Sequence, residues 1–216
     1  MTGNKARELM GVTALTVAVA FGLTMGVAHA ELGEVEVGGQ MPDFTMPIHG
    51  QAEDDDPVTL SELEGKVVVL DVRCHHCPWI RGADVQYREV VEEYGGDNVV
   101  FYGIDPHNPT GEGFATTTEQ VLEYNEDAGI NWPVLIDIDH EYSDTIGATR
   151  TPEVYIVDNR DADNMMTLVY HGAVDNRVSP NEPGDENYVA MALDDLLAGE
   201  PVQMARVNAW GCTINR

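Results

Sequence analysis

The chain has 216 residues, and 38 Asp and Glu against 11 Lys and Arg give it a formal charge of −27. Hydrophobic residues make up 43% and charged residues 23%, which is typical of one globular domain and excludes a disordered chain or a many-span membrane protein. So negative a chain repels phosphate backbones and anionic headgroups. Nucleic acid and membrane surfaces are therefore excluded as expected partners.

The N-terminus has the pattern of a secretory signal peptide. Lys5 and Arg7 precede an apolar stretch at 11–27, and residues 28–30 (Ala-His-Ala) form a small-residue cleavage site. The alternative is a retained membrane anchor, but Gly and Thr interrupt the stretch and no Cys follows it for lipid attachment. We expect residues 1–30 to be cleaved after Ala30, leaving a periplasmic or secreted protein with no membrane attachment.

Strands and helices alternate along the rest of the chain. Strands are expected where apolar, mostly β-branched runs are short: 66–72, 99–104, 133–136, 153–158 and 167–171. Helices are expected where apolar residues recur at helical spacing or a short turn is indicated: 58–65, 79–94, 118–128, 140–146 and 188–197. This order predicts a three-layer α/β fold, with a central mixed β-sheet flanked by helices. We expect one domain over 31–200 and a tail over 201–216.

Two of the three cysteines lie in a Cys-His-His-Cys-Pro motif at 74–78, between a predicted strand and a predicted helix. A thiolate at a helix N-terminus is stabilised by the helix dipole and by unpaired N–H groups, which lowers its pKa. Cys74 is therefore predicted to be the nucleophile. Cys77, three residues later, is close enough to form a disulfide with it and to expel the thiol of a bound partner.

The residues between the cysteines are expected to tune this chemistry. His75 and His76 can donate hydrogen bonds or positive charge to the Cys74 thiolate. Stabilising the reduced form raises the reduction potential of the pair. The sequence thus favours oxidising or isomerising behaviour over strong reduction.

A proline stands before the strand predicted at 153–158. The Thr151-Pro152 bond can be cis at a cost of only about 0.5–1 kcal/mol relative to trans. Next to a dithiol, a cis proline would hold the extended backbone of a partner against the sulfurs. The alternative is an ordinary trans proline at the start of a strand.

These motifs resemble the thioredoxin-like superfamily, and within it the redoxin group of AhpC/TSA-like and TlpA-like domains. The resemblance covers about residues 35–200 and rests on four segments: Pro42-Asp43-Phe44, Leu60 to Lys66, the strand through the dithiol motif to Trp79, and Arg150-Thr151-Pro152. It implies a thioredoxin fold, dithiol chemistry at Cys74 and Cys77, and a cis Pro152. Trp79, Thr151 and Pro152 are then the expected substrate-docking residues.

The sequence departs from the family pattern at two points. The peroxiredoxin pattern P-x3-T-x2-C fails because Asp71 lies three residues before Cys74, and Cys74 itself lies three before Cys77. A dedicated peroxidase is therefore disfavoured. Arg73 replaces the tryptophan that usually precedes a thioredoxin dithiol, and its guanidinium is expected to favour a thiolate.

Cysteine and histidine also bind zinc and copper, so the motif raises the alternative of a metal site. There is no second Cys-x-x-Cys, and Pro78 stands where haem attachment needs histidine. His107, His140 and His171 are scattered and are expected to be surface or core residues. We expect no metal and no cofactor.

The third cysteine, Cys212, lies in the tail. It is a third redox residue, a second resolving cysteine or a buried thiol. A buried carboxylate that accepts the Cys77 proton fits this fold, and Asp71, Glu62 and Asp105 all compete for that role.

The sequence as a whole predicts an exported thiol–disulfide oxidoreductase that acts on protein thiols and disulfides through Cys74 and Cys77. Two alternatives stay open: a thiol peroxidase-like enzyme related to the peroxiredoxins, and a non-enzymatic copper-binding or chaperone module.

Overall fold

The computed structural model describes residues 33–52, 54–106, 117–161 and 166–216. The signal peptide expected at 1–30 and the histidine at position 107 lie outside these residues, so both interpretations stay predictions.

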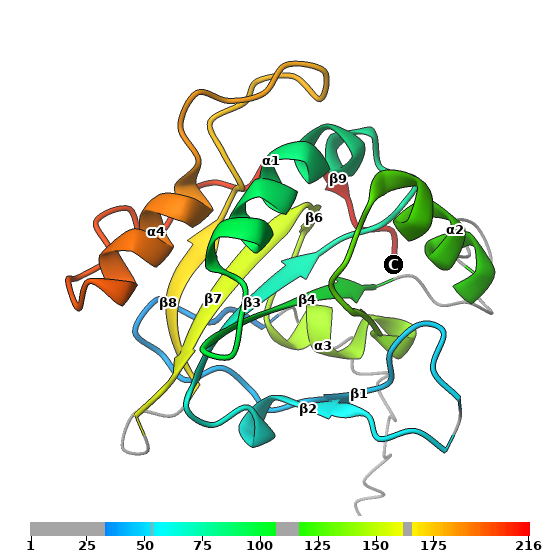
Figure 1. Cartoon of the computed structure of the whole chain (residues 1–216), viewed down its shortest axis with the longest axis horizontal. Helices are drawn as coiled ribbons and strands as arrows, with labels where there is room; N and C mark the ends of the chain where they lie inside the picture. The colour runs from blue at the N-terminus through cyan, green and yellow to red at the C-terminus, as the bar shows by residue number, and fades with distance from the viewer. Residues whose placement is uncertain (1–32, 53, 107–116, 162–165) are drawn as a thin grey trace, which may run out of the picture. The chain divides into compact units, whose positions relative to one another are not determined.

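A five-stranded mixed sheet forms the centre of the fold, in the order β5-β4-β3-β7-β8 (Figure 1). Strands β3 (Lys66–Val72), β4 (Val99–Asp105) and β5 (Val134–Ile136) run parallel. Strands β7 (Glu153–Asn159) and β8 (Thr167–Gly172) are antiparallel to their neighbours. β3 is the central strand, and its continuous apolar sequence is buried on both faces from Val67 to Val72.

Alternate residues of β3 enter two different hydrophobic clusters. Val67 and Val69 pack with residues of α1 (Pro78–Tyr94) and α4 (Tyr188–Leu197). Val68 and Leu70 pack on the other face with the N-terminal segment and with α3 (Glu141–Thr145), which follows the 3-10 turn η2 (Ile138–His140). Helices therefore cover both faces, as Figure 1 shows, and the predicted three-layer α/β fold is confirmed.

The remaining helix, α2 (Thr118–Ala128), begins and ends where the sequence indicated. Thr117 and Gln120 form a capping box at its start. Gly129 ends it in the left-handed conformation, with a φ of 67°. Both signals are local, which is why they can be found in the sequence.

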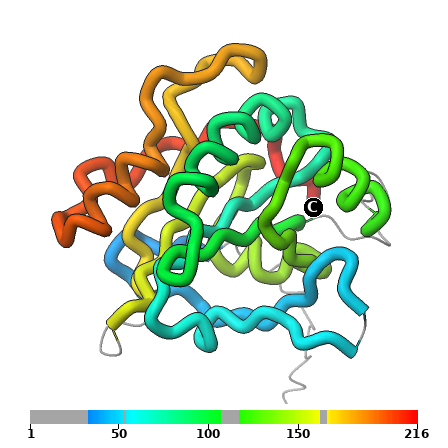
Figure 2. The backbone as a smooth tube through the Cα atoms, viewed as in Figure 1, coloured from blue at the N-terminus to red at the C-terminus, as the bar shows by residue number. Residues whose placement is uncertain are grey.

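Two small antiparallel pairs complete the fold. β1 (Thr45–Met46) pairs with β2 (Val58–Thr59), and the helical turn expected at 58–65 is only the 3-10 turn η1 (Leu60–Glu62). β6 (Arg150–Thr151) pairs with β9 (Cys212–Thr213) in the tail. Figure 2 shows the red tail crossing from α4 past the end of the sheet where α1 begins.

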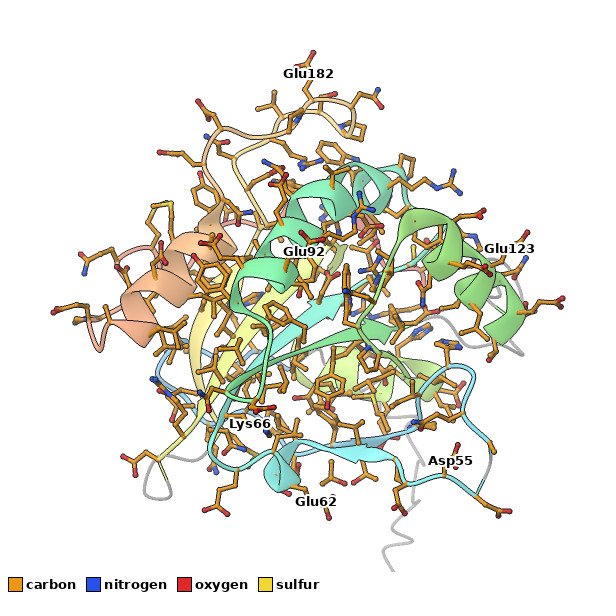
Figure 3. The ribbon with its side chains drawn as sticks, in the orientation of Figure 1. Asp55, Glu62, Lys66, Glu92, Glu123 and Glu182 are labelled. Atoms are coloured by element: carbon orange, nitrogen blue, oxygen red, sulfur yellow. A yellow bond between two sulfur atoms is a disulfide. The ribbon has the colours of Figure 1, made fainter. Side chains whose placement is uncertain are left out.

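Many of the acidic residues lie on the surface. The five acidic side chains labelled in Figure 3 are all exposed: Asp55, Glu62, Glu92, Glu123 and Glu182. Among the helices in the described part of the chain, none combines the length and the hydrophobicity that a membrane span needs.

Candidate functional site

The dithiol motif lies at the end of the sheet where β3 passes into α1. Cys77 is the N-cap residue of α1, and Pro78 occupies the first turn, where its missing N–H costs nothing. Cys74 lies before the helix, so Cys77, and not Cys74, is the cysteine at the helix N-terminus. Cys74 is 6% exposed and Cys77 is 2% exposed.

Cys77 is joined by a disulfide to Cys212, with 6.1 Å between the Cα atoms, and Cys74 is a free, buried thiol. The bonded pair in this structure therefore differs from the Cys74–Cys77 pair expected from the sequence, and that couple stays a prediction. The three sulfur-bearing residues line one pocket of about 180 Å³, together with His76, Pro78, Thr213 and Asn215.

Thr151 lies against both cysteines of the motif. Its hydroxyl oxygen is 3.7 Å from the Cys74 sulfur, and its carbonyl oxygen is 3.1 Å from the Cys77 sulfur. The bond between Thr151 and Pro152 is cis, which confirms the sequence expectation. The segment expected to dock partners is thus in contact with the sulfurs.

The environment of Cys74 raises the pKa of its thiol above the ordinary value. Burial is the largest cause, and the Asp105 carboxylate adds to it. The Thr151 hydroxyl and the backbone N–H groups of Cys77 and His76 act in the opposite direction. The sequence predicted a lowered pKa; the helix-end N–H groups are present as expected, but desolvation of a nearly buried sulfur outweighs them.

Arg73 lies in a group that we call the thiol-side cluster, made of the buried charged residues Asp71, Arg73 and Asp84 and the half-buried Tyr124. The guanidinium contacts Asp71 at 3.0 Å and Asp84 at 2.8 Å, and the Tyr124 hydroxyl donates to Asp84. Burial raises the pKa of Asp71 to about 7, against the lowering effect of Arg73. Because two carboxylates already engage Arg73, its expected action on the Cys74 thiolate stays a prediction.

The two histidines of the motif contact each other, with 3.7 Å between their ring centroids. His76 lines the pocket that contains the three cysteines, whereas His75 lines a small hollow with Arg73, Asp105 and Tyr124. Their expected effect on the thiolate is not tested by this arrangement. In the described part of the chain, no group of three or more His, Cys, Asp or Glu could hold a metal ion.

The choice among the three carboxylates that compete for the role of proton acceptor to Cys77 stays a prediction. The Asp105 carboxylate raises the pKa of Cys74. Asp71 lies in the thiol-side cluster, and Glu62 is exposed in η1. His140 is half-buried at the end of η2 with its ring against the Pro106 carbonyl, and His171 is buried.

A second charged group, which sequence reasoning missed, begins at Glu153 directly after Pro152 and extends from buried residues of β7 and β8 to the exposed Arg206. This tail-side cluster consists of Glu153, Tyr155, His171 and Arg206. Glu153 binds the His171 ring at 2.5 Å and also accepts from the backbone N–H groups of Thr149 and Arg150 at 2.8 and 2.9 Å. His171 stacks on Tyr155 and contacts Arg206 of the tail. These hydrogen bonds lower the pKa of Glu153 despite its burial. A glutamate that opens an otherwise apolar strand was the available signal.

The fold is that of the thioredoxin-like proteins. A hypothetical protein from Sinorhizobium meliloti 1021 superposes with a TM-score of 0.71 at 22% identity, covering 85% of this chain and 96% of its own. An uncharacterized conserved protein from Geobacillus kaustophilus gives 0.71 at 25%, with 84% and 92% covered. A putative thiol:disulfide interchange protein DsbE from Chlorobium tepidum gives 0.53 at 15%, with 77% and 98% covered.

The sequence model of the AhpC/TSA family matches residues 37–162, and the chain belongs to this family. Family and fold together make it an oxidoreductase of the thioredoxin-like class. No curated protein matches the sequence.

Proposed function

We propose that the chain is an exported thiol–disulfide oxidoreductase that acts on the thiols and disulfides of other proteins. The observation that carries this function is the position of Thr151, whose side chain and carbonyl contact the sulfurs of Cys74 and Cys77. An extended partner backbone that pairs with this segment would bring its own sulfur to the dithiol. Export is supported by the signal-peptide pattern at 1–30.

The reaction begins with Cys74 as thiolate and Cys77 as thiol. The Cys74 sulfur attacks one sulfur of a partner disulfide, a Cys74–partner bond forms, and the other partner sulfur leaves as a thiolate. Cys77 then loses its proton and attacks the Cys74 sulfur. The Cys74–Cys77 disulfide forms, the second partner sulfur leaves, and two electrons have passed to the partner. The reverse sequence oxidises a partner dithiol.

Residues around the dithiol have distinct tasks in this scheme. The Thr151 hydroxyl and the N–H groups of His76 and Cys77 stabilise the thiolate of Cys74 against its burial. His75 and His76 tune the potential, while Trp79 and Pro152 form the surface on which the partner lies. Because the pKa of the Cys74 thiol is raised, the rate of the first attack should increase with pH through that pKa.

The test is turnover of insulin disulfides, measured as precipitation with dithiothreitol as the electron source. Cys74→Ser should lose all activity above background, because the proposed function assigns the first attack on the partner disulfide to Cys74. Cys77→Ser should instead accumulate a covalent adduct of Cys74 with the partner, which is visible on a non-reducing gel.

Hydrogen peroxide consumption is measured in parallel on the same samples. Insulin turnover that survives Cys74→Ser would contradict the proposed function. Rapid peroxide consumption without insulin turnover would replace it with the peroxidase alternative.

A further inference from the structure

The expected docking surface, which we define as Trp79, Thr151 and Pro152, is covered by the chain's own tail. The rings of Trp79 and Trp210 lie 5.2 Å apart. Cys212 pairs with Thr151 in the antiparallel β6–β9 ladder. Gly211 approaches so closely that a Cβ there would lie 2.2 Å from the Thr151 carbonyl oxygen and 3.2 Å from the Pro152 nitrogen.

The tail segment, residues 210–214, is held at both ends. At its start, the Trp210 indole N–H donates to the Asp175 carbonyl at 2.7 Å, and the Arg177 guanidinium lies 5.0 Å from the Trp210 ring centre. At its end, Ile214 is 2% exposed and its N–H donates to the Thr149 carbonyl. The segment is therefore an extended strand bound along the edge that a partner needs.

We propose that the tail segment is a tethered competitor for the docking surface, locked in place by the Cys77–Cys212 disulfide and unlocked by Cys74. This inference rests on the proposed function, since it assigns the same surface to partners. The occupant that the tail excludes is an extended, cysteine-containing segment of another protein, which would pair with Arg150 and Thr151 as β9 does.

Unlocking is a thiol–disulfide exchange within the chain. Cys74 gives up its proton, and its thiolate attacks the Cys77 sulfur. The Cys74–Cys77 bond forms, the Cys77–Cys212 bond breaks, and Cys212 leaves as a thiolate that takes up a proton. No electrons enter or leave, because one disulfide replaces another. The three cysteines line the same pocket, so the exchange needs no external reagent.

The exchange changes how the tail is held. Before it, the tail segment is bound covalently and a partner cannot displace it. Afterwards the contacts that remain are all non-covalent: the short β ladder, the contacts of Trp210 with Trp79, Asp175 and Arg177, and the Ile214 packing. A partner can then compete for the edge of β6, so the catalytic pair becomes oxidised and accessible in one step.

The exchange is tested by alkylation of the oxidised protein, followed by peptide mass spectrometry. In the wild type, we expect two singly labelled species, one at Cys74 and one at Cys212, because the disulfide moves between the two positions. In Cys74→Ser, Cys212 should stay unlabelled. Label at Cys74 alone in the wild type would overturn the unlocking step. This readout needs no partner, so it is independent of the proposed function.

Competition by the tail segment is tested with fully reduced protein and insulin. Trp210→Ala removes the aromatic and cationic contacts and should raise the rate of insulin reduction roughly three- to tenfold. Gly211→Ala should act in the same direction, because its Cβ meets the Thr151 carbonyl. Asn208→Ala, exposed in the same tail but outside the segment, is the matched control and should leave the rate unchanged.

Rates of Trp210→Ala and Gly211→Ala equal to that of Asn208→Ala would overturn the competition. If no variant reduces insulin while the labelling pattern is as expected, the proposed function fails and the internal exchange stands.

Discussion

Two charged clusters adjoin the site, and they connect different parts of the chain. The thiol-side cluster joins β3, α1 and α2, with two carboxylates around the single guanidinium of Arg73. The tail-side cluster joins β7 and β8 to the tail, with Glu153 as its one carboxylate. The first borders Cys74, since Arg73 and Tyr124 line a small hollow with it, whereas the second connects β7 and β8 to Arg206, which precedes the tail segment. Changes in the first should therefore act on stability, and changes in the second should also reach the tail.

The largest effect is expected for Asp84→Ala in the thiol-side cluster. The substitution removes one partner of a buried ion pair and leaves the charge of Arg73 undercompensated. The free energy of unfolding, measured by urea titration, should fall by about 3–5 kcal/mol. Glu92→Ala removes an exposed carboxylate from the same helix and should change it by no more than about 0.5 kcal/mol. Similar losses in both variants would contradict the importance of the cluster.

Glu153→Gln should lower the free energy of unfolding less than Asp84→Ala does, but its effect should extend to the tail. The amide keeps the size of the side chain but loses the charged acceptor that binds His171 and the N–H groups of Thr149 and Arg150. We expect a loss of about 1.5–3 kcal/mol in the free energy of unfolding.

The same variant should loosen the tail, because Arg206 is held through His171. This effect is measured as faster alkylation of Cys212 in the reduced Glu153→Gln protein than in the reduced wild type. Asp84→Ala should not show faster alkylation when it is compared under conditions in which both variants have the same free energy of unfolding. Equal rates in all three proteins would remove the distinction between the clusters.

The two clusters should respond to pH with opposite signs. The pKa of Asp71 is about 7 in the folded protein, whereas the ordinary value of an aspartate, taken for the unfolded chain, is 3.8. Between these two pH values the folded state retains a proton that the unfolded state loses. Stability should therefore fall as pH rises from about 4 to 7, by up to about 1.4 kcal/mol per pH unit. The pKa of Glu153 is lowered below 4.5, so its contribution is present above that value and is lost as pH falls through the folded pKa.

Urea titrations between pH 3 and pH 8 separate the two groups. Asp71→Asn should flatten the decline between pH 4 and 7 while leaving the loss at acid pH. Glu153→Gln should do the reverse. A decline between pH 4 and 7 that persists in Asp71→Asn would assign it to another group.

The smallest expected effect is that of Tyr124→Phe. This change removes one hydroxyl that donates to Asp84 but leaves the Arg73–Asp84 ion pair intact. A loss of about 0.5–1.5 kcal/mol is expected, as for one net hydrogen bond. A loss as large as that of Asp84→Ala would mean that the hydroxyl, and not the ion pair, holds the cluster together.

Sequence patterns were sufficient to predict the bounds of those helices and strands that are determined by local sequence. β3, α2 and α4 begin and end at the predicted residues, because a continuous β-branched run, a capping box and a helical apolar face are all local. The pairing of β6 with β9 was missed. Two-residue strands have no periodicity, and their pairing depends on how the finished sheet positions the tail.

The residues of the candidate site were predictable from the sequence, but the disulfide pairing and the pKa of the Cys74 thiol were not. The spacing of Cys74 and Cys77 and the cis Pro152 were indicated by the motif and the family resemblance. The bond between Cys77 and Cys212 was not, because spacing does not determine which cysteines pair. The raised pKa of Cys74 depends on burial and on Asp105, which only the packed structure supplies.

The Cys77–Cys212 bond also makes a large covalent ring, since the two cysteines are 135 residues apart. A cross-link of this span removes loop-closure entropy from the denatured chain, which the chain-entropy model values at about 5 kcal/mol at 25 °C. A Cys74–Cys77 bond joins residues only three positions apart and constrains the denatured chain very little. The position of one disulfide within the three cysteines therefore sets not only the state of the tail but also how far the denatured polypeptide can expand.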